Sequence, residues 1–158
     1  MASTSSNKQP LLVDSVLHEV FDLNGKYVTG LDIAGTNDAT LILNAVGTDG
    51  AILEDIYTIA RSTTPYTVHM YLSSSSDYLR PNDGIFIGEL ASATTVAIVT
   101  EWNFAPTILA PVPNLGSDAY FRALYVPKGK CLWAALLNTN PSVPITDGPI
   151  FGVQGGWY

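Results

Sequence analysis

The chain has 158 residues, of which 47% are hydrophobic and 13% are charged, and its formal net charge is −7. This length predicts one domain with a single core, and the lack of clustered lysine and arginine argues against binding to nucleic acid or to an anionic membrane. Charged residues make up about a quarter of an average soluble domain, so the low charge here indicates that part of the surface is covered in an assembly.

The N-terminal stretch predicts an arm. Residues 1–10 are polar and rich in serine, and the apolar residues Leu11, Leu12 and Val13 follow them. We expect residues 1–16 to form an extended N-terminal arm beside a folded domain that spans residues 17–158. Composition leaves open whether the arm becomes ordered in an assembly or is a disordered tail. The stretch has no signal-peptide core, and no apolar run approaches the roughly 20 residues that a membrane-spanning helix needs.

The remainder of the chain has the pattern of short strands separated by turns. In chain order, strands are predicted at residues 39–46, 51–60, 66–73, 85–92, 94–102, 119–126, 130–138 and 149–158. The second of these also carries isoleucines at helical spacing, but its β-branched composition favours a strand. The proline-rich stretch 103–116 predicts a long connection. About eight strands and one crossover indicate an all-β fold, an antiparallel β-sandwich that is jelly-roll-like.

One predicted strand also predicts the position of a histidine. Residues 66–73 alternate between apolar and polar side chains, which places Val68 and Met70 on a buried face. His69 then lies on the opposite, polar face, so we expect a surface or interface histidine.

No catalytic signature is present: the phosphate-binding loop, the dinucleotide-binding pattern and the nucleophile elbow are all missing. Glu54 and Asp55 are adjacent, and neighbours on a strand point to opposite faces, so they are not expected to share a cleft. Asp32 and Asp38 flank a glycine turn that lacks the spacing of a calcium loop. Cys131 is the only cysteine and is expected to be buried. We predict no catalytic residue, no metal and no cofactor.

The aromatic residues have two interpretations. Three tryptophans and eight tyrosines can be exposed platforms that bind carbohydrate, or they can fill a core and a subunit interface. The absence of internal repeats favours the second interpretation. The residues predicted to contact another subunit or a partner are Leu11, Leu12, Val13, Trp102, Trp133, Trp157 and Tyr158. The last two follow a glycine pair, and we expect them to be mostly buried.

The segments YFRALYVPKGKCLWAALLNT (120–139), GPIFGVQGGWY (148–158) and GTDGAILEDIYTIAR (47–61) resemble small jelly-roll capsid cement or decoration proteins of tailed bacteriophages. The positions that match the strand pattern of that family are Leu124, Val126, Pro127, Gly129, Leu132 and Trp133, and those that match its C-terminal ending are Gly155, Gly156 and Tyr158. Trp157 departs from the family, in which aspartate is common at this position.

The resemblance implies a non-enzymatic protein of the outer capsid surface of a virion, made in the host cytoplasm. In this family such a protein binds and stabilises the shell of the major capsid protein, often as a homotrimer. The alternative is a phage receptor-binding or fibre-tip module that binds host glycans. An enzyme such as a depolymerase is the least supported hypothesis, since no pair of carboxylates or nucleophile with its base has the required spacing.

Overall fold

The computed structural model describes residues 15–28, 39–79, 84–102, 111–113, 120–137 and 145–157, and for residues 111–113 and 120–122 it describes the backbone alone. All regular secondary structure in these segments is β-strand, which confirms the predicted all-β class. The strands are β1 (Ser15–Asp22), β2 (Tyr27–Val28), β3 (Thr40–Asn44), β4 (Gly50–Ile59), β5 (Thr67–Ser73), β6 (Ile85–Ala91), β7 (Val99–Glu101), β8 (Pro111–Pro113), β9 (Tyr120–Arg122), β10 (Leu124–Pro127), β11 (Cys131–Leu137) and β12 (Ile150–Trp157).

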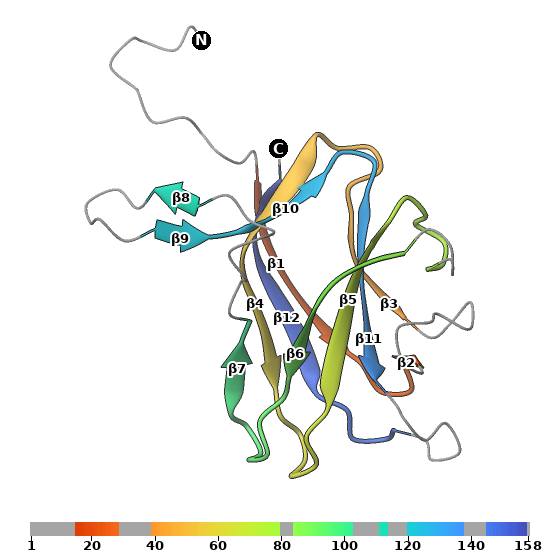
Figure 1. Ribbon diagram of the computed structural model, residues 1–158, viewed down its shortest axis with the longest axis vertical. Helices are drawn as coiled ribbons and strands as arrows, with labels where there is room; N and C mark the ends of the chain where they lie inside the picture. The colour runs from red at the N-terminus through yellow and green to blue at the C-terminus, as the bar shows by residue number, and fades with distance from the viewer. Residues whose placement is uncertain are drawn as a thin grey trace, which may run out of the picture.

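Two five-stranded sheets account for all of these strands except β8 and β9, which form a separate antiparallel pair (Figure 1). In sheet A, β12 lies between β1 and β4, and the other edge of β4 pairs with β10 near its start and with β7 near its end. In sheet B, β11 lies between β5 and the short strands β2 and β3, and β6 follows β5. Within the two sheets only the contact of β2 with β11 is parallel.

Both sheets contribute to one apolar core. Leu53 and Ile56 of β4 and Phe151 of β12 enter it from sheet A, whereas Met70 of β5 and Leu132 of β11 enter it from sheet B. These side chains are fully buried. Two sheets that bury their inner faces against each other are consistent with the β-sandwich predicted from the sequence.

Most of the predicted strands are present with small shifts of their ends. Those predicted at residues 39–46, 66–73, 85–92, 130–138 and 149–158 correspond to β3, β5, β6, β11 and β12. The segment at residues 51–60, whose isoleucines are also at helical spacing, forms strand β4, as its β-branched composition predicts. The strand predicted at residues 94–102 forms only at its end, as β7, and the one predicted at residues 119–126 is divided between β9 and β10.

Strand β1 is absent from the predicted elements because its pattern is interrupted. Its inward side chains, Leu17 and Phe21, are separated by an exposed glutamate. Pairing with β12 begins at Ser15, so the last two residues of the arm predicted over residues 1–16 belong to sheet A. The rest of that arm lies outside the described residues.

The outer side of sheet B carries a second apolar cluster. Its buried members are Val28, Ala39, Tyr71, Leu79, Cys131, Trp133 and Ala135. Along β11 these residues alternate with those of the core between the sheets, so the strand is buried on both faces. Cys131 is fully buried, which confirms its predicted environment.

The prediction of a surface position for His69 is wrong, because the side chain is only 3% exposed. Its Nδ1 lies 3.2 Å from the hydroxyl of Tyr71, and its ring packs edge-on against Phe86 with 5.1 Å between ring centroids. Its Nε2 lies 3.6 Å from a carboxylate oxygen of Glu89. Burial raises the pKa of Tyr71 to about 12. Alternation along β5 identifies the faces correctly, but it does not reveal that the second face is also covered.

A β-bulge on β4 corrects the expectation for its two adjacent carboxylates. The pairing of β4 with β12 shifts between Gln154 and Gly155, which leaves Glu54 without a partner on β12. Leu53 and Ile56 both enter the core, and the two residues between them do not. Glu54 is exposed and Asp55 is half-buried, so both carboxylates lie outside the core rather than on opposite faces of the sheet.

Close approach of β12 to β4 at the bulge requires glycine. We expect Gly155→Ala to lower the free energy of unfolding by roughly 1–3 kcal/mol, because its Cβ would run into the carbonyl oxygen of Ile52. Gly47→Ala is the matched control, since a Cβ there meets no atom within 4 Å, and it should not reduce stability. Urea unfolding measures both variants. An unchanged midpoint for Gly155→Ala would contradict the close pairing of the two strands.

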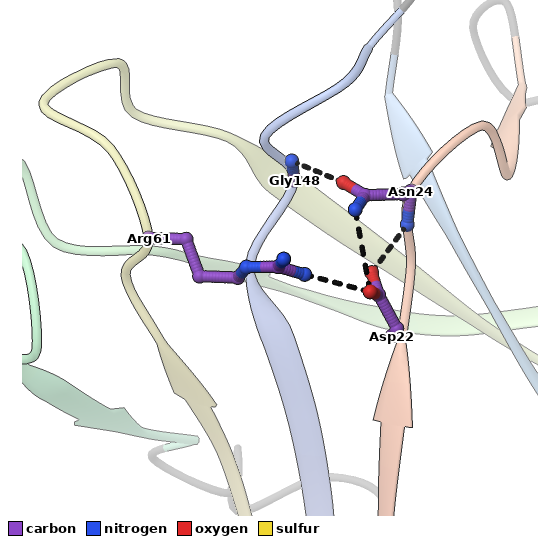
Figure 2. A network of polar contacts seen from close by, with 4 residues as sticks. All are labelled: Asp22, Asn24, Arg61 and Gly148. Atoms are coloured by element: carbon purple, nitrogen blue, oxygen red, sulfur yellow. Dashed lines mark hydrogen bonds and ion pairs between the residues drawn. The ribbon is translucent and has the colours of Figure 1, made fainter.

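A polar network closes the end of sheet A at which β1 ends (Figure 2). Arg61 donates a hydrogen bond of 2.7 Å to Asp22, and the backbone N–H of Asn24 donates one of 2.9 Å to the same carboxylate. The backbone N–H of Gly148 donates to the side-chain oxygen of Asn24 at 2.7 Å. Desolvation opposes ionisation of Asp22, but the hydrogen bonds from Asn24 and Arg61 and the guanidinium charge outweigh it and lower its pKa. The network connects β1 to the segments that follow β4 and precede β12.

Two variants separate the contributions within this network. Asn24→Ala should lower stability by roughly 1–2 kcal/mol, because the N–H of Gly148 loses its acceptor in a partly buried position. Asp22→Asn should cost less than about 1 kcal/mol, because the ion pair is largely exposed. The effect of Asp22→Asn should be present above the ordinary aspartate pKa of about 3.9 and should vanish as the pH falls through the lowered pKa of the folded state. Urea unfolding at pH 7 and pH 3 measures these differences, and equal effects at both pH values would contradict this assignment.

Candidate interaction face

The predicted contact residues that the structure describes, Trp102, Trp133 and Trp157, do not all belong to one apolar cluster. Trp133 is buried in the outer cluster of sheet B, and its indole N–H donates to the carbonyl of Ser75 at 3.1 Å. Trp102 and Trp157 are partly buried and pack against the core between the sheets. Leu11, Leu12, Val13 and Tyr158 lie outside the described residues.

The outward side of sheet A is a different candidate site. We call face A the residues of this sheet that point away from sheet B: Val16, His18, Val20 and Asp22 of β1; Ile150, Gly152, Gln154 and Gly156 of β12; Ile52, Glu54, Asp55, Tyr57 and Ile59 of β4; Val99 and Glu101 of β7; and Tyr125 of β10. The strand register places them in rows. One row consists of Val16, Gly156, Ile52 and Tyr125, and another of Val20, Gly152, Tyr57 and Glu101.

Large apolar side chains remain exposed on face A. Val16 is 84% exposed, and Val20, Val99 and Tyr125 are each about half exposed. A valine on a sheet gains stability only when its side chain is covered. Among the described residues, none covers these side chains in the way that the second apolar cluster covers the outward side of sheet B.

A tyrosine fixes the middle of face A. The hydroxyl of Tyr57 lies 3.3 Å from Nε2 of His18, so a hydrogen bond connects β4 to β1. The strand between them, β12, carries Gly152 there, and a Cβ at that position would run into the ring of Tyr57. The missing side chain thus lets the ring lie across the central strand, where only 9% of Tyr57 is exposed.

The carboxylates of Glu54 and Asp55 lie between the two rows, and that of Glu101 is at the end of the second row. Tyr57 is paired with Glu101, so Asp55, two residues earlier on the same face, is a diagonal neighbour of that glutamate. Burial raises the pKa of Asp55, and the charge of Glu101 raises it further.

Positive charge is missing from face A itself. The set contains carboxylates and one histidine but no lysine or arginine. The cations that follow β4 and β10 in the chain, Arg61 and Lys128, form ion pairs with Asp22 and with Asp49. In the segments that the structure describes, no group of three or more metal-ligating side chains could hold an ion.

Two further apolar side chains, Val96 and Ile98, are about half exposed in the turn ahead of β7. Ala97 between them has φ of 65°, a left-handed conformation that is unfavourable for alanine. Its N–H donates to the carbonyl of Ala60 at 2.8 Å, and the N–H of Ala60 donates to the carbonyl of Ile98 at 3.1 Å. These bonds fix the turn against the end of β4.

Alanine in a left-handed turn should reduce stability. We expect Ala97→Gly to raise the free energy of unfolding by about 0.5–1 kcal/mol, because glycine adopts positive φ without steric cost. Ala91→Gly, an exposed position at the end of β6 without positive φ, should instead lower it by a similar amount. Urea unfolding measures both variants. A loss of stability in Ala97→Gly would show that the turn does not depend on this conformation.

The described segments contain no helix that could cross a lipid bilayer. No protein-family model matches the chain, and no curated protein and no solved structure matches it. Its function must therefore be inferred from the geometry of face A and from the sequence segments quoted above.

Proposed function

We propose that this protein is a non-enzymatic structural protein of a virion, a decoration protein that binds and stabilises the shell of the major capsid protein from the outside. The observation that supports this proposal is face A, a sheet surface that holds exposed valines in fixed positions beside a tyrosine. Large apolar patches on an otherwise folded domain are typical of protein interaction sites. The capsid as partner comes from the resemblance of the segments quoted above.

The strand order supports a jelly roll as the specific fold. In sheet A the short strands β7 and β10 both pair with β4, and counted as one position they give the order β1, β12, β4, β7/β10. The short strands β2 and β3 of sheet B both pair with β11 and are counted in the same way. Sheet B then has the order β2/β3, β11, β5, β6. This grouping gives eight positions in two four-stranded sheets, which supports a jelly roll.

Face A also favours a protein partner over the glycan alternative. A glycan site would need exposed aromatic platforms that lie close together. Among the described residues the exposed large aromatic side chains are Tyr125 on sheet A and Phe86 on sheet B, so they belong to different sheets. The three tryptophans are buried or packed against the core.

The proposal is tested by two measurements, one on the purified protein and one on capsids that lack it. We expect light scattering to give three times the 16.9 kDa mass of the chain, because the family that the quoted segments resemble often forms homotrimers. We expect the protein to co-sediment with the capsids and to raise their disassembly temperature. A monomer that does not bind capsids would reject the proposal, and binding to host glycans in its place would support the receptor-binding alternative.

A further inference from the structure

We infer that face A binds a protein surface that combines apolar side chains with lysine or arginine, and that a cation of this partner lies against Glu54, Asp55 and Glu101. The inference rests on the proposed function only for the identity of the partner as the capsid shell. Its chemistry follows from the charges and exposed side chains of face A.

The first argument is the repulsion between the carboxylates. Asp55 and Glu101 are diagonal neighbours on adjacent strands, and Glu54 is brought to the same region by the bulge. Asp55 is half-buried, so its charge is less well solvated than that of an exposed aspartate. A cation from a partner would relieve this repulsion, whereas an apolar or acidic partner would increase it.

The second argument excludes a second copy of this chain on the same surface. A twofold contact would place face A against itself, so the carboxylates of both copies would come together. Face A supplies no lysine or arginine that could pair with them, and the whole chain carries a net charge of −7. Charge complementarity therefore requires a basic partner.

The third argument concerns the exposed apolar side chains that lie beside the carboxylates in the two rows. Val16 and Tyr125 lie in one row, and Val20 lies in the other. When a partner covers these side chains, water is also excluded from the carboxylates beside them. An ion pair is stronger in such a desolvated position than at an exposed surface. The apolar residues thus supply affinity, and the carboxylates select a basic surface.

The primary test measures the affinity of wild type and variants for capsids that lack the protein, at several sodium chloride concentrations. The double variant Asp55→Asn/Glu101→Gln should bind at least about tenfold more weakly than wild type, and its binding should depend less on salt. The control Asp77→Asn/Glu89→Gln removes the same net charge from segments associated with sheet B, and it should bind like wild type. Equal affinity of wild type and Asp55→Asn/Glu101→Gln would overturn the inference, although the proposed function would stand.

Stability of the free protein is a second readout, which shows that the variants fold. Asp55→Asn should raise the urea midpoint at pH 7, because it removes a charge that burial and Glu101 disfavour. The pKa of Asp55 is raised in the folded state, so this gain should disappear as the pH falls below the ordinary aspartate value of about 3.9. A lower midpoint at pH 7 would contradict the repulsion on which the inference depends.

A probe without capsids separates the inference from the proposed function. A peptide of alternating lysine and leucine should shift the backbone amide NMR signals of β4, β12 and β7, and a glutamate–leucine peptide should not. If capsids do not bind but the lysine peptide shifts these signals, the proposed function fails and the inference stands. If the lysine peptide causes no shift at these strands, the inference fails. It also fails if Val16→Asp converts an oligomer of the protein to a monomer, because face A is then occupied by a second copy of the chain and not by a basic partner.

Discussion

The structure of sheet A depends on how closely β12 can approach its two neighbours. This strand lies between β1 and β4 and pairs with both along its length. Two of its glycines make this possible in different ways. Gly155 lets the backbone of β4 come close at the bulge, and Gly152 makes room for the ring of Tyr57. A side chain at position 155 would push against the backbone of β4, whereas one at position 152 would displace the ring of Tyr57.

Sequence alone predicts the strands whose two faces differ clearly or whose composition is strongly β-branched, such as β4 and β5. It does not predict β1, because this edge strand exposes Val16 and Val20 and interrupts its inward pattern with a glutamate. An apolar residue on the outward side of an edge strand has the same appearance in the sequence as one in the core. This is also why face A could not be identified before the strand register was known.

The positions of Glu54, Asp55 and His69 show a second limit of periodicity. Strict alternation assigns adjacent carboxylates to opposite faces, but a single extra residue in a bulge shifts the alternation. Alternation places His69 correctly on the outward face of β5, but only the tertiary structure shows that aromatic side chains cover this face. A large aromatic ring fills a core as well as it fills an interface, so the tryptophans in the sequence do not by themselves distinguish these two positions.

The two outer surfaces of the protein are unequal. Around β5 and β11 the outward side of sheet B has its own apolar cluster, whereas the outward side of sheet A leaves valines in contact with water. A molecule that binds through face A but not through the outward side of sheet B would cover a surface in a single layer. Once face A is occupied, the next molecule to arrive meets the outward side of sheet B, where the apolar side chains around β5 and β11 are already covered. Such a coat would stop growing when the surface beneath it is full, with no separate signal needed to end its assembly.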